Sequence, residues 1–324
     1  MTQVLPHCER CGSAIEAGDL RCPVCYRAVL QASGDREPSI RIHVLRCSSC
    51  GAAMEYRARV QSPQCAFCAS VLKIEQQTDP MEQTEQYLPF TVDRQTALAV
   101  YRRWLSRQGF FRPSNLASAA RLESLRALWW VGWAVDAKAV VTWTVDSNDG
   151  ARRASWAPHA GELETVFDGI VIPATRGLSP VECAKLIPTY VLTSGVQPLE
   201  TEGISAVRER FATSRSVARG RIVEVIARMA EGRIKGRGAP GIRFCNFHAA
   251  IHLRGLVTRR IAFPAYAIAY RYGGRLYRSV ISGQDSACIV GQLPHSLAKL
   301  AVVIVLICAG LVAMGLIVGS GLLR

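Results

Sequence analysis

Residues 128–146 read LWWVGWAVDAKAVVTWTVD, and this run sets the character of the middle of the chain. Aromatic and β-branched residues dominate it, as they do in buried strands. We therefore expect a strand, a turn and a second strand here. The tryptophans of this run are expected to pack in a core or against a sheet rather than to form a platform for ligands: Trp129, Trp130, Trp133 and Trp143.

Helices and further strands are expected on both sides of this run. Asp93 is a suitable N-cap for a helix that ends near residue 108, and a shorter helix begins near Asn115. Residues 202–237 read as one long helix or as two shorter ones, because Gly220 interrupts the pattern. Beyond them we expect a hairpin turn at residues 272–275 and three consecutive strands: 242–256, 259–272 and 276–283.

Eight of the twelve cysteines form four C-x-x-C pairs near the N-terminus. Each pair places two thiolates on one tight turn, and two facing pairs make the closed tetrahedral site that zinc prefers. Four sulfur ligands leave no open position for water or substrate, so both sites are expected to be structural. Disulfides and an iron site are the alternatives. The expected ligands of the two Zn²⁺ ions are Cys8, Cys11, Cys22 and Cys25, and Cys47, Cys50, Cys65 and Cys68.

A second apolar run lies at the C-terminal end of the chain. Residues 301–323 read AVVIVLICAGLVAMGLIVGSGLL and contain no charged side chain. Roughly 20 apolar residues in a helix cross the hydrocarbon core of a bilayer, so this run predicts a transmembrane helix. The N-terminus shows no signal-peptide pattern. We therefore expect a single-pass C-terminal anchor in the cytoplasmic (inner) membrane, with the bulk of the chain in the cytoplasm.

The glycines of this run have two interpretations. Gly315 and Gly319 form a G-x-x-x-G pattern, which lets two helices approach closely and would support a homodimer. Ordinary membrane-helix composition also explains them.

The expected fold class is α+β. It combines two N-terminal zinc ribbons of four cysteines each, a mixed β-rich body with helices, and one C-terminal transmembrane helix. The polar composition of the segment before the body favours a ribbon module that moves relative to the body. The expected limits are 1–30 for the first ribbon, 41–74 for the second, 75–86 for the linker, 87–294 for the body and 298–323 for the transmembrane helix.

The formal net charge of +14 is concentrated in one block. Residues 201–278 contain sixteen basic and four acidic side chains. Close to an anchor, such a block suits anionic headgroups. A solvated helix face and a nucleic-acid contact are the alternatives. The side chains expected at an anionic surface are Arg208, Arg215, Arg219 and Arg228.

Familiar catalytic motifs are absent from the sequence. It contains no H-E-x-x-H, no G-x-S-x-G, no Walker A loop and no dinucleotide-binding glycine pattern after a strand. His248 and His252 share one face of the expected strand, but no third ligand or acid stands near them in sequence. We therefore predict that the protein is not an enzyme.

The order of these parts resembles that of bacterial zinc-ribbon membrane proteins labelled as having a transcription-factor-IIB-type ribbon or as primosomal-helicase-like. The resemblance covers about residues 45–300. Its motifs are short. They are Pro89-Phe90, Trp104-Leu105, Phe111-Arg-Pro-Ser-Asn-Leu116, residues 129–137, Phe263-Pro-Ala-Tyr266, residues 270–277, residues 281–286 and Gly291-Gln-Leu-Pro294.

Several features depart from that family pattern. Ser282 stands where the family has asparagine, and Asp285-Ser286 stands for Thr-Gly. The first ribbon is an addition. Because the chain lacks an ATP-binding motif, the helicase label has no support in the sequence. The resemblance implies no enzymatic reaction and is compatible with a scaffold.

Two functions follow as expectations. The first is a membrane-anchored, non-catalytic adaptor that presents a cytoplasmic zinc-binding module to a protein partner, with its body against membrane lipid. The alternative is a membrane-associated nucleic-acid-binding protein that uses the arginine-rich residues 201–278. Two zinc–tetrathiolate sites carry about −4 together, which offsets the basic residues of the ribbons and favours the adaptor.

Overall fold

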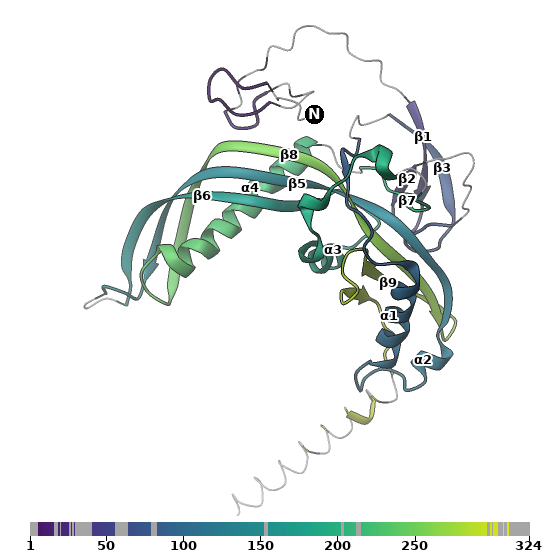
Figure 1. The fold of residues 1–324 in the computed structure, drawn as a ribbon. Coiled ribbons are helices and arrows are strands. Elements are labelled where there is room, and N and C mark those ends of the chain that lie inside the picture. The colour runs from purple at the N-terminus through teal and green to yellow at the C-terminus, as the bar shows by residue number, and fades with distance from the viewer. Residues whose placement is uncertain are drawn as a thin grey trace, which may run out of the picture.

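The computed structural model centres on an arched antiparallel sheet, with helices and two cysteine-rich segments packed around it (Figure 1). The residues that the structure describes are 6–15, 19, 21–25, 27, 29, 41–55, 64–78, 83–151, 155–201, 204–211, 215–296, 299, 301–303, 307 and 310.

Two long strands form the spine of the sheet. β5 (Arg121–Ser147) and β8 (Phe244–Tyr272) pair antiparallel along their whole length, from Arg121 opposite Arg271 to Ser147 opposite Phe244. At about 3.3 Å per residue, strands of this length extend roughly 90 Å. Figure 1 shows both bending into the arch.

Both strands continue through places where the sequence predicted interruptions. The turn expected within residues 128–146 is wrong, and so is the break expected between residues 256 and 259. Neither place has the Asn-Gly or Pro-Gly chemistry that a tight turn needs. Register shifts between Val135 and Ala137 and between Lys138 and Ala139 absorb the irregularity instead.

Shorter strands extend this spine on both sides. The sheet order is β10-β9-β8-β5-β6, and the two-residue strands β4 and β7 add parallel pairs to β8 and β5. The hairpin turn predicted at residues 272–275 is confirmed, with Gly273 and Gly274 both at positive φ. The bounds are β4 Gln86–Tyr87, β6 Ala157–Pro173, β7 Val207–Arg208, β9 Arg275–Ser282 and β10 Ile289–Gly291.

A separate three-stranded sheet belongs to the second cysteine-rich segment, in the order β2-β1-β3. Its strands are β1 Arg41–Cys47, β2 Ala53–Glu55 and β3 Leu72–Thr78. We call residues 41–55 and 64–78 the second ribbon, and the described residues between 6 and 29 the first ribbon. We call β6, with the β5 and β8 residues that lie beside it, the arm.

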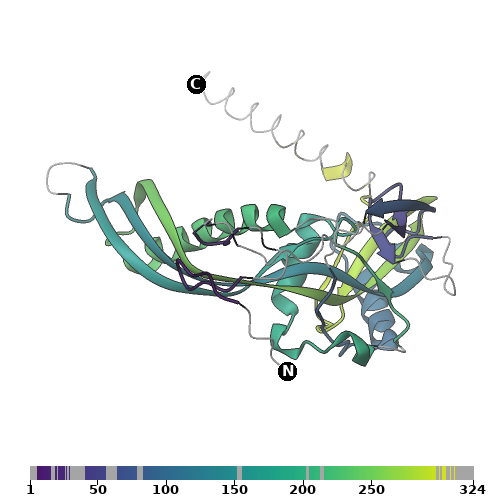
Figure 2. The ribbon, with the colours of Figure 1, turned by 90° about the horizontal axis from the view of Figure 1, so that it is seen from above.

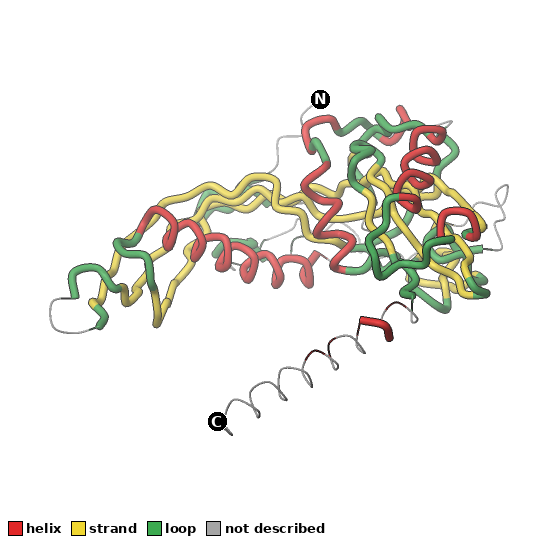
Figure 3. Tube along the Cα trace, turned by 90° about the horizontal axis from the view of Figure 1, so that it is seen from below, coloured by secondary structure: helices red, strands yellow, loops and turns green. Residues whose placement is uncertain are grey.

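The helices flank the main sheet. The predicted N-cap is confirmed, because the Asp93 carboxylate accepts a hydrogen bond from the Thr96 N–H at 2.8 Å. α4 lies along one face of the arm (Figures 2 and 3). The bounds are α1 Arg94–Ser106, α2 Leu116–Ala119, α3 Pro180–Leu186 and α4 Arg215–Arg233, with short turns at Ile187–Thr189, Leu192–Ser194 and Pro198–Thr201 and a π-helical end at Ile234–Gly238.

Residues 128–146 of β5 are apolar because both faces of the strand are covered there. Odd-numbered residues of β5, such as Trp129 and Trp133, share a buried cluster with Ile222 and Ile226 of α4. Even-numbered residues, such as Trp130, share another cluster with α3 and the second ribbon. All four tryptophans predicted to pack in a core are buried.

Two expectations about fold and location are wrong. The fold class is mostly β rather than α+β, because β5, β6 and β8 extend through segments that the sequence predicted as shorter strands and turns. The transmembrane helix expected at 298–323 is also contradicted: no helix within the described part of the chain is long and apolar enough to cross a membrane. That finding also overturns the single-pass location in the cytoplasmic membrane. Most of the range, with Gly315 and Gly319, lies outside the described residues.

Truncating Ile226 to alanine should destabilise the protein by about 2–5 kcal/mol, because this fully buried side chain joins α4 to the sheet. Urea denaturation followed by circular dichroism measures the loss. Arg228→Ala on the exposed side of the same helix is the control, expected within about 0.5 kcal/mol of the parent. Equal unfolding midpoints for the two variants would contradict this packing.

Candidate metal centres

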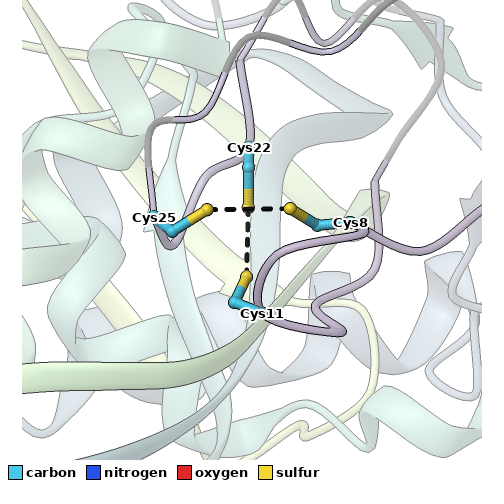
Figure 4. Close-up of side chains that lie close together, drawn as sticks. All are labelled: Cys8, Cys11, Cys22 and Cys25. Atoms are coloured by element: carbon cyan, nitrogen blue, oxygen red, sulfur yellow. Dashed lines mark hydrogen bonds between the residues drawn. The ribbon is translucent and has the colours of Figure 1, made fainter.

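The first cluster brings together all four predicted cysteines. The sulfur atoms of Cys8, Cys11, Cys22 and Cys25 lie within 4.8 Å of one another and point inward (Figure 4). The Cys8–Cys25 and Cys11–Cys22 Sγ–Sγ distances are both 3.6 Å. Four sulfurs placed tetrahedrally about 2.3 Å from an ion lie about 3.8 Å apart, so the cage fits a zinc-sized ion.

The second cluster has the same construction. Cys47, Cys50, Cys65 and Cys68 also lie within 4.8 Å of one another. The Cys47–Cys68 Sγ–Sγ distance is 3.4 Å and the Cys50–Cys65 distance is 3.6 Å. The predicted ligands therefore form two sets of four, and either set can hold a metal ion.

The local sequence explains how each pair of thiols is held. Gly12 and Gly51 follow the first pair of each cluster at positive φ, and their N–H groups donate to the carbonyls of Cys8 and Cys47. That conformation costs glycine little. Backbone N–H groups also point at sulfur, for example from Phe67 to Cys65 Sγ at 3.4 Å. Such donors favour the thiolate, which is the form that binds metal.

The thiols within one cluster differ in how readily they ionise. Hydrogen bonds from the backbone of Cys11 and Arg10 lower the pKa of Cys8 to about 6. In the second cluster, hydrogen bonding with Cys50 lowers the pKa of Cys68 and raises the pKa of Cys65. Within the second cluster, the thiolate of Cys68 is thus favoured at the expense of that of Cys65. A bound divalent ion removes that conflict by stabilising all four thiolates.

The second ribbon is part of the core of the body. Phe67, between two of its cysteines, shares a buried cluster with Leu128, Trp130 and Leu178. The Arg210 N–H donates to the Ala53 carbonyl at 2.9 Å, which adds a backbone contact with the body. The expectation of a ribbon module that moves freely on a linker does not fit this packing.

Gly177 of the body packs directly against the ring of Phe67 in the second ribbon. A Cβ at this position would lie 2.6 Å from the ring of Phe67, so a side chain larger than hydrogen does not fit. The Glu209 carboxylate accepts a hydrogen bond from the Gly177 N–H at 3.3 Å, and Arg278 donates to the Gly177 carbonyl at 2.6 Å. The backbone of Gly177 is therefore held from both sides while Phe67 packs on it.

The first ribbon reaches the body through a different kind of contact. Asp19 accepts from Arg219 of α4 at both carboxylate oxygens, at 2.7 and 3.1 Å. Val24 packs against the cluster that contains Trp133 and Ile222. Among the described residues, this charged contact and the side chain of Val24 link the ribbon to α4 and to the core beneath it.

The four arginines expected at an anionic surface do not share one exposed face. Arg208 lies over the ring of Tyr87 at 4.9 Å and donates to Thr201 at 2.8 Å. Arg219 is engaged with Asp19. Arg228 is exposed, and the side chain of Arg215 lies outside the described part of the structure.

Part of the charge of the basic block is paired within the fold. Five of its arginines pair with carboxylates from earlier in the chain: Arg219 with Asp19, Arg259 with Asp136, Arg260 with Glu85, Arg271 with Glu123 and Arg278 with Glu182. The more exposed of these pairs, such as Arg271–Glu123, add little stability. They do remove charge that the sequence had suggested was available to a partner.

Sequence reasoning missed the residues that attach the two ribbons. Phe67 carried a signal, since an aromatic residue inside a C-x-x-C pair must pack somewhere. Gly177, Glu209 and the Asp19–Arg219 pair carried none, because their partners are far away in sequence.

Comparisons of the chain with protein-family models, with curated proteins and with solved structures found no match. The resemblance described above therefore stays a prediction.

Replacing Gly177 with alanine should destabilise the docked second ribbon by about 1–3 kcal/mol, because the new methyl group overlaps Phe67. Gly232→Ala is the matched control, since nothing lies within 4 Å of its Cβ position and alanine favours the helix by about 0.5–1 kcal/mol. Thermal unfolding of both variants measures the effect. A Gly177→Ala protein as stable as its parent would rule out the tight contact.

Glu209 should make stability fall as the pH rises. Burial raises its pKa from 4.5 to about 7. Between these values the folded protein keeps a proton that the unfolded chain has released, so stability is lost as the pH increases through this window, by at most on the order of 3 kcal/mol.

The Glu209→Gln variant should lack this pH-dependent loss of stability. Urea unfolding of metal-saturated protein from pH 5 to 8 measures it, and the difference in stability between variant and parent should move in favour of the variant with rising pH. Parallel curves would show that the carboxyl group does not titrate in this window.

Proposed function

We propose that the protein is a non-catalytic adaptor whose two four-cysteine clusters each hold a structural Zn²⁺ ion and shape surfaces for a protein partner. The observation that carries this proposal is the closure of both cages, with four sulfur atoms within 4.8 Å in each set. A cage of four thiolates suits zinc and leaves no coordination position for substrate. Zinc would supply folding energy to segments with small cores of their own.

The arrangement of the clusters supports an architectural role. The second ribbon packs into the core beside Trp130, so an ion there would stabilise the centre of the body. The first ribbon sits by α4 at the base of the arm (Figure 1). The two ions would thus support two separate surfaces of one sheet, an organisation suited to binding proteins rather than to chemistry.

Nucleic-acid binding through residues 201–278 is the weaker alternative. Five arginines of that block already face carboxylates, so fewer positive charges are free to meet phosphates. Exposed arginines elsewhere in the block keep the alternative open to test, among them Arg221, Arg228, Arg237, Arg243, Arg254 and Arg275.

Protein purified without chelators should contain two zinc ions per chain by elemental mass spectrometry. Cys47→Ser/Cys50→Ser should reduce this to one and lower thermal stability, because the second ribbon belongs to the core. Cys245→Ser, which alters a cysteine outside both clusters, is the control and should keep two ions. Zero or one ion in the parent protein would refute the metal assignment.

Affinity purification of protein partners tests the adaptor role separately from the metal assignment. Protein partners recovered by affinity purification of the parent and of Cys245→Ser should be lost from variants that lack one cluster. Duplex DNA should not be retained at physiological salt. Tight DNA binding with a steep dependence on salt would support the alternative instead.

A further inference from the structure

The Asp19–Arg219 pair is largely removed from water. The side chain of Asp19 is 4% exposed and that of Arg219 is 18% exposed. Both carboxylate oxygens receive a guanidinium N–H, at 2.7 and 3.1 Å. This two-pronged geometry is the strong form of an arginine–carboxylate contact and depends on accurate placement of both groups.

Because both charges are buried, the ion pair either forms completely or breaks completely. A carboxylate and a guanidinium tolerate burial only while they face each other, because an unpaired charge must regain its water. A small displacement of Asp19 would therefore expose both groups rather than stretch the pair.

The metal cage is what can hold Asp19 in place. Asp19 lies between the two cysteine pairs of the first cluster, a few positions before Cys22. The buried hydrophobic cluster of this ribbon within the described residues consists of Cys8, Ile15 and Cys22, with Val24, Cys25 and Val29 packed against it, and its three cysteines belong to the cage. So small a core contributes too little free energy to keep the ribbon folded without an ion.

The second ribbon is attached in another way. Met54, Ala66 and Phe67 are buried together with residues of β5 and α3, so apolar packing holds it to the body whatever the state of any one charged pair. The two clusters should therefore respond differently to loss of metal.

We propose that the first cluster is a metal-operated clamp on α4. While the ion is bound, the cage presents Asp19 to Arg219 and the first ribbon covers the beginning of the helix. When the ion leaves and the thiolates take up protons, the ribbon loses its fixed shape, Asp19 withdraws, and the Arg219 side of α4 becomes accessible. This inference rests on the metal assignment proposed above.

Carbodiimide coupling in the full chain tests the clamp. In an Arg219→Lys protein the reagent can join the Asp19 carboxylate to the introduced amine as an amide, with the lost water transferred to the reagent, when the two groups are in ion-pair contact. Peptide mass spectrometry detects the product. Adding Cys8→Ser/Cys11→Ser should lower its yield at least about tenfold, because the cage can no longer form.

An ion pair in the arm is the matched control. Arg259 and Asp136 lie 2.9 Å apart, both within the main sheet. Coupling in an Arg259→Lys protein should proceed equally with and without the two cysteine changes. A loss of this product would reveal general unfolding rather than release of the clamp.

A second variant separates the clamp from the folding of the ribbon. Asp19→Asn keeps all eight cysteines, so it should retain two zinc ions per chain while trypsin cleaves after the exposed Arg21 and Arg27 several times faster than in the parent. Unchanged cleavage, or an amide product in the Arg219→Lys protein that persists without the cage, would overturn the clamp. Zinc content in the same samples shows separately whether the metal assignment has failed.

Discussion

The pairing of β5 with β8 is the constraint on which the rest of the structure depends. These strands pair from Arg121–Arg271 to Ser147–Phe244, and the other strands of the main sheet build outward from them. The two faces of β5 then separate the remaining elements, with α4 on one side and α3 with the second ribbon on the other. Burial of both faces requires a long uninterrupted apolar strand, and such a strand keeps the two cysteine clusters apart.

Local features were predictable from the sequence, whereas long-range pairings were not. The spacing of the cysteines identified both cages, because their ligands belong to short turns whose geometry is set within four residues. The Asp93 cap and the turn at Gly273 and Gly274 succeeded for the same reason. A β-rich middle followed from composition, but its division into short strands did not hold, since bulges replaced the expected turns.

Part of the charge of the basic block is paired within the fold for a physical reason. Charge along the chain is segregated, with carboxylates such as Glu85, Glu123 and Asp136 far from the arginines of residues 201–278. The strand pairing of the main sheet brings them together, because all three partner arginines lie on β8. An excess of charge in one part of a sequence therefore indicates how much charge a partner can reach only when that part does not pack against oppositely charged residues from the rest of the chain.

The two ribbons show how similar metal cages can be coupled to a fold in different ways. Around the second cage, apolar contacts link the ribbon to the sheet, and the backbone of Gly177 is held between Glu209 and Arg278. Apolar burial is roughly proportional to area and is not directional. Around the first cage, the ribbon is attached by the bidentate ion pair between Asp19 and Arg219, which forms only when both groups are correctly oriented. An ion in the second cage would therefore add to stability that the core already provides, whereas an ion in the first would decide whether its ribbon is docked at all.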